Sequence, residues 1–533
     1  MAQFTCEGVT GVGERSVRDR RWWVLATMVA PMFVVVLDNT VLTVALKPIQ
    51  QSLGATQSQL AWALNAYTLL FAGLLLTGSL VGDRYGHRRV LVVGLAIFGV
   101  ASALSAFAAT PDLLIVGRAL MGVGAAAVVP STLSVIGNVF GPAERGRALA
   151  VWAGATGVAV VVGPIAGGVL LTHFWWGSVL AVNVPVVLFS AVAIGRLVPE
   201  SRHPAPGRLD LLGVVLSIVG LVAVVYGISK GGETREWAGA PVLVPLLGGV
   251  AVLAVSGWRQ QRSDHPAPDL ALFGNPALLA AWAATTLAFF ALFGATFYLT
   301  FYLQYARGFT PLQAGLTFLP IVLALMTFAP RSARLVKEYG AKRVCAGGLL
   351  TVALAFGGYL FVDAQTPLLF VLLLLLLLGT GLAHVVAPAT ESMMATLSRD
   401  RVGAGSSVNN TVRQVGGALG VTVLGAVLAS SYRSHVEVVV QQVPEPLRGT
   451  ASESVGGALA VAARLPGAAG VRLADAARDA FVAAMHTTAA VSALVALLGA
   501  VIVLRYLPGL AAAGSGLAPP RGDRQPAVPA EGA

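Results

Sequence analysis

The sequence predicts an all-α integral membrane protein. Of its 533 residues, 56% are hydrophobic and only 11% are charged, whereas soluble globular proteins carry about 25% charged residues. The mean hydropathy is +0.79. About fourteen apolar stretches are long enough to cross a bilayer, which takes ~20 helical residues. Because they use on the order of half the chain, no interval remains for a sizeable soluble catalytic domain.

These apolar stretches also predict where each helix lies. The first follows an arginine-rich segment and runs for about 25 residues from Trp22, too long for the core of a cleaved signal peptide, so it is expected to persist as a helix. The stretches in the first half are 22–46, 60–82, 90–108, 112–138, 148–171 and 178–197, and two more follow at 211–229 and 238–257. Those in the second half are 277–305, 313–330, 343–362, 367–390, 410–430 and 480–506.

The basic residues predict the orientation of these helices. Most of the 35 Lys and Arg residues fall in alternate connections and at the two ends, and cytoplasmic loops are the ones that carry such an excess. Both termini are therefore expected in the cytoplasm, with 1–21 and 507–533 as tails. The second tail is rich in Ala, Gly and Pro and is expected to be disordered. Because these loops account for the net charge of +11, nucleic acid is not expected as a partner.

A dense set of charges lies between the second and third stretches. It contains Asp83, Arg84, Gly86, Arg88 and Arg89. An acid beside guanidinium groups at helix ends forms charge-assisted hydrogen bonds that break when helices separate, which predicts a gating loop. The alternative is a solvated loop whose charges only set the orientation.

Glycines and a proline mark the stretch 148–171. They are Gly154, Gly163, Pro164, Gly167 and Gly168. Proline frees a backbone carbonyl and lets the helix kink, while glycines allow a neighbouring helix to pack closely. The pattern predicts a kinkable helix with a smooth face; a helix-packing groove with no further role is the alternative.

Two charged side chains fall inside apolar stretches. Charges are costly in a bilayer and are normally paired or functional. At 1.5 Å per residue, Asp38 lies ~24 Å from the cytoplasmic start of its helix and Arg118 ~9 Å from the outer start of its own. These depths nearly coincide in a core ~30 Å thick. We therefore predict that they pair and take part in proton coupling; a purely structural ion pair is the alternative.

The three patterns resemble motifs of the major facilitator superfamily. The charged loop is similar to the family's signature loop, although Ser79 stands where the family has Gly and His87 replaces an Arg. The glycine pattern resembles the antiporter motif of export proteins. The run around Arg118 resembles the fourth-span motif, with Met121 in place of a Gln.

The resemblance extends over nearly the whole chain to the fourteen-span drug and proton antiporter branch, which includes exporters of quaternary ammonium compounds and cationic dyes. It implies two six-helix bundles, 22–197 and 277–506, and a linker, 198–257, that carries two inserted helices. Within the second bundle, 431–478 is expected to form an outer loop. A run in this loop, 453–462, forms either a short amphipathic helix or plain surface loop.

Function and site follow from the same resemblance. It implies proton-coupled export of amphipathic drugs or antibiotics across the cytoplasmic membrane by alternating access, which confers resistance. The first alternative is proton-coupled uptake, and the second is a membrane-embedded sensor or enzyme. The residues expected to couple protons or bind substrate are Asp38, Arg118 and Glu391. The residues expected to line the cavity are Trp62, Asn65, Tyr67, Phe290, Tyr298, Asn410 and Arg413.

The expected partners are a small drug or antibiotic, protons and the lipid bilayer, with the protein a monomer. Neither a cofactor nor a metal is expected, since no metal-ligand spacing, phosphate-binding Gly-Lys-Ser run or nucleophile motif occurs in the sequence. Some cation exporters of the branch have acids where this chain has Leu325, Asn409 and Asn410. Because each buried cation charge requires a counter-charge, we expect neutral or monovalent, largely aromatic or polyketide-like substrates.

Overall fold

The structure is a computed structural model that describes residues 11–201, 210–234, 236–262, 274–396 and 402–507. In these ranges the regular elements are helices and no strand occurs, as expected where backbone groups must be satisfied without water. Thirteen of the described helices are long and apolar enough to cross a membrane. The predicted all-α membrane fold is confirmed, whereas the count of fourteen spans stays a prediction.

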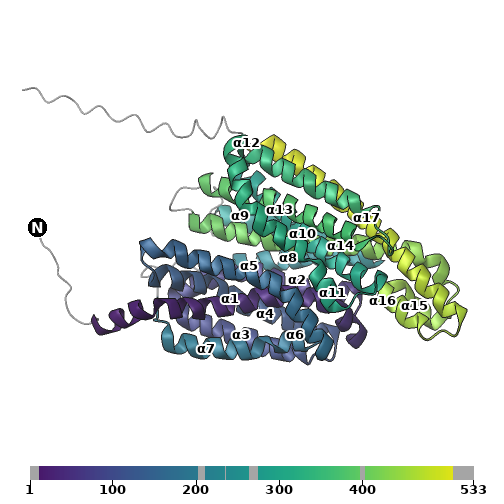
Figure 1. Cartoon of the computed structure of the whole chain (residues 1–533), viewed down its shortest axis with the longest axis horizontal. Helices are drawn as coiled ribbons and strands as arrows, with labels where there is room; N and C mark the ends of the chain where they lie inside the picture. Colours follow the sequence, from purple (N-terminus) through teal and green to yellow (C-terminus); the bar gives the residue numbers. More distant parts are fainter. Residues whose placement is uncertain (1–10, 202–209, 235, 263–273, 397–401, 508–533) are drawn as a thin grey trace, which may run out of the picture.

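The helices of the first half lie together in one half of the molecule (Figure 1). They are α1 (Gly11–Leu53), α2 (Gln57–Tyr85), α3 (His87–Ala106), α4 (Pro111–Val139), α5 (Pro142–His173), α6 (Ser178–Ala181) and α7 (Asn183–Leu197). Thr56 and Gln59 form a reciprocal capping box that fixes the start of α2. Because α1 begins at Gly11, helix extends into the segment predicted as a tail.

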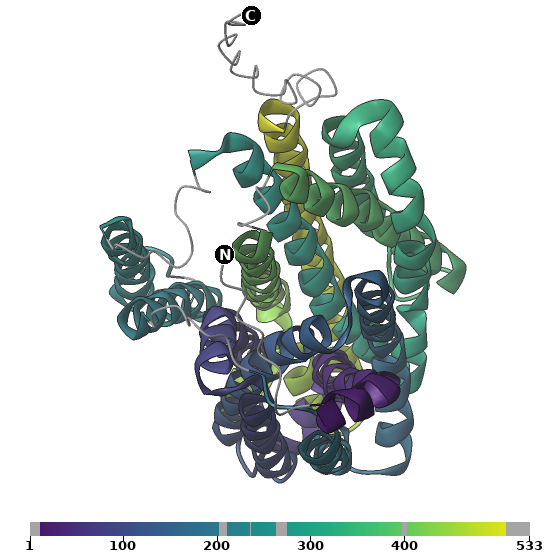
Figure 2. The same cartoon turned by 90° about the vertical axis from the view of Figure 1, so that its left-hand side faces the viewer.

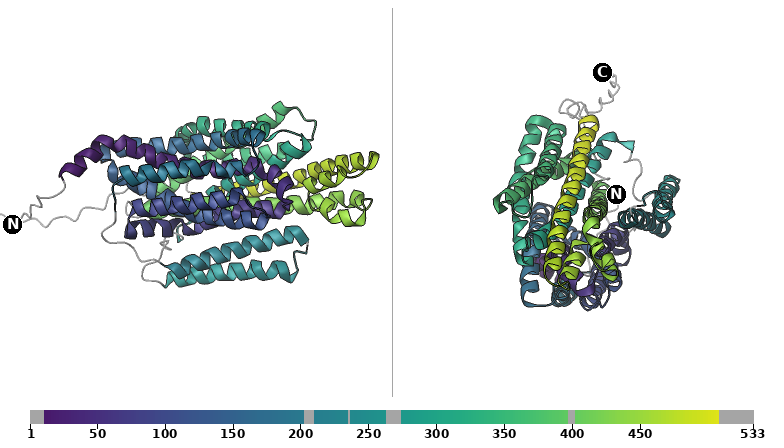
Figure 3. Two further views of the ribbon diagram at one scale, coloured as in Figure 1. Left: turned by 90° about the horizontal axis from the view of Figure 1, so that it is seen from below. Right: turned by 90° about the vertical axis from the view of Figure 1, so that its right-hand side faces the viewer.

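The helices α8 (Leu211–Thr234) and α9 (Ala240–Gln261) form a hairpin at the side of the two halves (Figures 2 and 3). Arg259 closes the hairpin with two hydrogen bonds to Asp210, at 2.7 and 2.8 Å. These bonds lower the pKa of the Asp210 carboxyl. On its inner side α8 packs against α2 and α14, so the hairpin contacts both halves.

The second half contains the remaining helices (Figure 1). They are α10 (Pro276–Phe301), the π-helix η2 (Tyr302–Ala306), α11 (Pro311–Thr317), α12 (Leu319–Tyr359), α13 (Leu368–Thr396), α14 (Val402–Val440), α15 (Glu445–Glu453), α16 (Val455–Ala462) and α17 (Ala468–Tyr506). Gly340 has φ 80° and ψ 151° inside α12, a conformation that favours glycine. It divides α12 into two helical segments, which overlap the predicted stretches 313–330 and 343–362.

Most of the predicted outer loop 431–478 is helical. The helix α14 runs on to Val440, α17 begins at Ala468, and α15 and α16 lie between them. The helix α16 falls within the run 453–462 for which a short amphipathic helix was one of the two expectations. The predicted disordered tail lies, from residue 508 onward, outside the described residues.

Candidate functional site

A cavity of about 390 Å³ lies between the two halves. Its walls come from α1, α2, α4 and α5 on one side and from α10, α12 and α14 on the other. Six aromatic side chains line it: Tyr67, Phe71, Trp152, Phe289, Phe293 and Phe318. Polar groups are few and lie mainly on α1 and α14. Its volume and largely apolar lining suit a drug-sized ligand.

The deepest charges lie directly behind this cavity, where α1 and α4 meet. Arg118 Nη1 donates to Asp38 Oδ2, and the two residues are 0% and 1% exposed. Asn183 Nδ2 donates to the other carboxylate oxygen at 2.8 Å, and Arg118 Nε donates to the Ala63 carbonyl at 3.2 Å. Burial of such a pair is tolerated because each charge has a partner and further hydrogen bonds.

Tyr67 links this ion pair to the cavity. Its ring lines the cavity and packs against the Arg118 guanidinium, 4.4 Å from ring centroid to guanidinium carbon. Arg118 Nη2 has no hydrogen-bond partner among the described residues. Met121, which stands at the position of the family's Gln, places its sulfur 3.8 Å from Arg118 Nη1. A ligand that touches Tyr67 therefore touches a side chain in contact with the buried charges.

The glycines of α5 bring this helix against α1 just beyond Asp38. A Cβ atom at Gly163 would lie 1.9 Å from Thr40 Oγ1, and one at Gly167 would lie 2.9 Å from Val44. Gly168 faces Leu312 of α11 in the other half, whereas a Cβ at Gly154 would meet nothing within 4 Å. Pro164, between them, lines the cavity. The helix face that carries Gly163, Gly167 and Gly168 thus packs against α1 in the first half and against α11 in the second half.

The charged loop between α2 and α3 binds the end of α7. Asp83 and His87 pair at 3.0 Å, and Gly86 has φ 104° at the junction of the two helices. Glu200 accepts from the Arg88 backbone N–H at 3.2 Å and lies 3.5 Å from Arg89 Nε. These contacts all lie within the first half, so in this conformation the loop is held to α7.

We expect Glu200→Gln to loosen this loop. The change removes the charge that faces Arg89 and weakens the acceptor of the Arg88 N–H, and exposed loops held by few contacts open readily. Hydrogen–deuterium exchange of residues 86–89 should rise several-fold, while exchange of α1 stays unchanged. Glu445→Gln, an exposed site on α15, is the matched control; equal protection of the loop in both variants would contradict this role.

At the opposite end, hydrogen bonds join the two halves. Lys47 Nζ donates to the Gln304 carbonyl at 2.7 Å, and Tyr305 OH donates to Gln50 Oε1 at 2.7 Å. Gln50 Nε2 in turn donates to Ser454 Oγ at the start of α16, at 3.2 Å. The charge pattern predicts that this end faces outward. The described halves are therefore held together at the end predicted to face outward.

The comparison with known families agrees with this architecture. The family model described as Major Facilitator Superfamily matches residues 30–421, more than half of the chain. The chain belongs to the major facilitator superfamily. It is therefore a multi-pass membrane protein, as the sequence predicts.

Related members of the superfamily include proteins named for drug resistance. The chain is 36% identical over 487 residues to the multidrug efflux pump LfrA of Mycolicibacterium smegmatis, covering 91% of this chain and 96% of that one. It is 36% identical to the puromycin resistance protein Pur8 of Streptomyces alboniger, covering 78% and 84%. A bacterial homologue of the human lysosomal transporter Spinster, solved inward-facing, shares the fold with a TM-score of 0.63 at 16% identity, covering 91% and 97%.

Of the other predicted site residues, some line the central cavity and others lie outside it. Asn410 and Arg413 line the cavity with Tyr67. Four predicted cavity residues lie outside its lining: Trp62 packs near Tyr226 of α8, Asn65 donates to Thr422 at 2.7 Å, and Phe290 and Tyr298 are buried between helices. Glu391 is exposed and lies in a separate groove between α12 and α13, which shares only Leu325 with the central cavity among the described lining residues.

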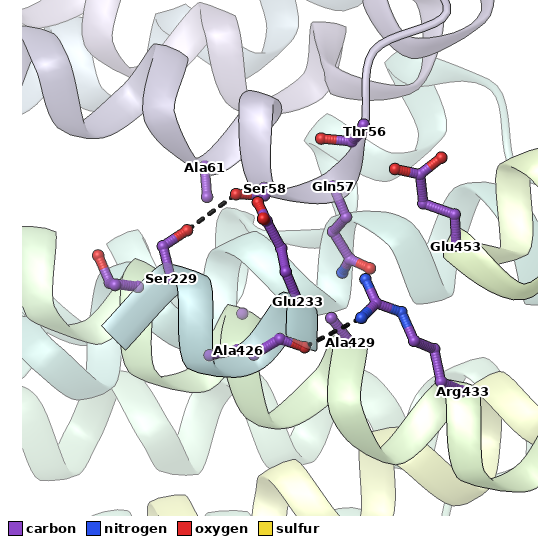
Figure 4. A pocket seen from close by; sticks show the side chains of 13 residues that line it. Thr56, Gln57, Ser58, Ala61, Ser229, Glu233, Ala426, Ala429, Arg433 and Glu453 are labelled. Atoms are coloured by element: carbon purple, nitrogen blue, oxygen red, sulfur yellow. Dashed lines mark hydrogen bonds between the residues drawn. The ribbon is translucent and has the colours of Figure 1, made fainter. Parts of the chain in front are cut away.

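A second, small pocket lies where α8 meets both halves of this superfamily fold (Figure 4). Ser58 and Ser229 hydrogen-bond there at 2.8 Å, and Arg433 donates to the Gly232 carbonyl at 3.4 Å. Burial raises the pKa of the Glu453 carboxyl, and the positive charge of Arg433 opposes this shift. The pocket encloses about 30 Å³, close to the volume of one water, so it is too small for a drug.

Proposed function

We propose that this member of the superfamily exports amphipathic aromatic drugs or antibiotics in exchange for protons and thereby confers resistance. The observation that carries the proposal is the contact chain from the cavity through Tyr67 and Arg118 to Asp38. The names of the related proteins, a multidrug efflux pump and a puromycin resistance protein, support it. The glycine pattern of α5, typical of export proteins, supports the direction.

Asp38 is the proposed proton site. Protonation removes the negative charge that holds Arg118, and the guanidinium then keeps the Tyr67 ring and the Ala63 carbonyl as partners. An uncompensated charge in a buried site is strongly unfavourable, so Arg118 must shift when Asp38 takes up a proton. Because Tyr67 lines the cavity, that shift changes the surface on which the substrate binds. Proton uptake by Asp38 and substrate binding in the cavity therefore both act on the contact between Arg118 and Tyr67, and the proposal is that each disfavours the other.

The two predicted bundles, 22–197 and 277–506, are the proposed moving parts. The outer hydrogen bonds of Lys47 and Gln50 break as the cavity opens outward. The loop at Asp83, which is held to the end of the first half in this conformation, is the proposed gate at the opposite end. The hairpin of α8 and α9, which overlaps the predicted linker 198–257, lies beside both bundles. The protein is proposed to work as a monomer. Rocking of two bundles around a central site is the usual form of alternating access.

Inside-out membrane vesicles test the direction. With the lumen made acidic, an exporter that exchanges protons should accumulate a fluorescent aromatic dye in the lumen, and a protonophore should abolish the accumulation. Vesicles without the protein are the control. Gradient-driven loss of dye from the lumen instead would identify a symporter for uptake and contradict the proposal.

A further inference from the structure

The central cavity carries one charged side chain among its described lining residues, and it is basic. Arg413, on α14, faces the cavity, and no Asp, Glu or Lys lines it. Within the described part of the chain no carboxylate oxygen lies within 4.0 Å of the Arg413 guanidinium. The buried acid Asp38 is already paired with Arg118, and Glu391 lies in the separate groove.

The surroundings of Arg413 leave its charge available. Its guanidinium carbon lies over the Phe289 ring, 4.4 Å from the ring centroid. Asn410, about one turn earlier on α14, and Gln414, the next residue, also line the cavity. A guanidinium stays protonated in proteins, so Arg413 cannot avoid the cost of a positive charge at membrane depth by losing a proton. It needs an anion.

We propose that the substrates are amphipathic aromatic monoanions, with a carboxylate or an ionised acidic hydroxyl bound by Arg413. This inference rests on the proposed function, because it names the substrate class of the same cavity. Arginine presents N–H groups in a planar fork that matches a carboxylate. Asn410 and Gln414 supply further donors beside it, and the rings of Phe289, Phe293 and Trp152 receive the aromatic body.

The opposite wall fits the same kind of molecule. Asn39, Thr40 and Thr43 of α1 line the cavity across from α14, and these neutral groups can hydrogen-bond hydroxyl or carbonyl substituents. A cationic substrate would meet Arg413 as a like charge, without an acid among the described lining residues to offset it. The cavity therefore selects against cations and for acids.

Binding to the purified protein in nanodiscs, with no proton gradient, tests the substrate class alone. The probes are anthracene carboxylate, its neutral methyl ester and the cationic anthracenylmethylamine, at neutral pH. We expect the carboxylate to bind at least about tenfold tighter than the other two, equivalent to ~1.4 kcal/mol. Arg413→Gln should remove this preference and leave ester binding within about twofold, and Arg413→Lys should restore part of it. Arg334→Gln, at an exposed site on α12, is the matched control.

The outcomes separate the two proposals. The anionic class would be overturned by any of three results: tighter binding of the amine, equal binding of all three probes, or equal weakening of all three in Arg413→Gln. In that case, gradient-driven transport of the ester or the amine would still support proton-coupled export. Carboxylate binding that depends on Arg413 without gradient-driven transport would instead support the class and count against export.

Discussion

Asp38→Asn is expected to abolish proton-driven export. Asn keeps the shape of the side chain and an acceptor for Asn183, but it can neither take up a proton nor balance the charge of Arg118. The initial rate of gradient-driven uptake into inside-out vesicles should fall at least about 100-fold, a loss of ~2.7 kcal/mol. Exchange of bound substrate without a gradient should persist, because exchange does not require residue 38 to take up or release a proton.

Two further variants guard this test against a folding defect. Asp38→Glu keeps a carboxylate and should retain part of the gradient-driven rate. Asp112→Asn makes the same chemical change at the start of α4, where the carboxylate accepts from Gln59 on the exposed surface, and should transport normally. A gradient-driven rate in Asp38→Asn that matches the wild type would remove Asp38 from the mechanism.

Gly163→Ala should have the next largest effect. Its methyl group would lie 1.9 Å from Thr40 Oγ1 and 3.3 Å from the Leu37 carbonyl, so α5 must move away from α1 next to Asp38. Overpacking of a tight core typically costs about 1–3 kcal/mol. Gradient-driven transport should fall by at least about tenfold, and the apparent melting temperature of the detergent-solubilised protein should drop.

The same helix provides the control. Gly154→Ala introduces a methyl group with nothing within 4 Å and should leave transport and melting unchanged. Adding Thr40→Ala to Gly163→Ala removes the nearest atom and should restore part of the activity, while the remaining 2.9 Å approach to the Thr40 Cβ atom limits the recovery. Similar behaviour of Gly154→Ala and Gly163→Ala would show that this packing does not matter for transport.

The apolar lengths predicted the helices well because a bilayer fixes the minimum length of a span. Depth along each helix also predicted that Asp38 and Arg118 could meet, and the structure brings their side chains into contact. Helix ends were harder to predict. The helical segments before Trp22 and after Ser430 extend beyond the apolar core, where hydrophobicity carries no signal.

The rotation of each helix about its axis could not be predicted in this way. On α10 the face toward the cavity carries Phe289, Leu292, Phe293 and Thr296, at helical spacing, whereas Phe290 points elsewhere. Lipid and protein interior are both apolar, so the sequence pattern does not separate these faces. Glu200 was missed for another reason: its partners at Arg88 and Arg89 lie far away in the sequence, and only the fold brings them together.

Substrate-induced proton movement tests the coupling most directly. Proteoliposomes containing a pH-sensitive dye and no imposed gradient are loaded with the aromatic substrate, and the external substrate is then removed. The account predicts that substrate leaving through the wild-type protein drives protons in the opposite direction, so that the lumen pH falls, and that Asp38→Asn gives no pH change. Substrate flux through the wild-type protein without any change in lumen pH would contradict proton exchange.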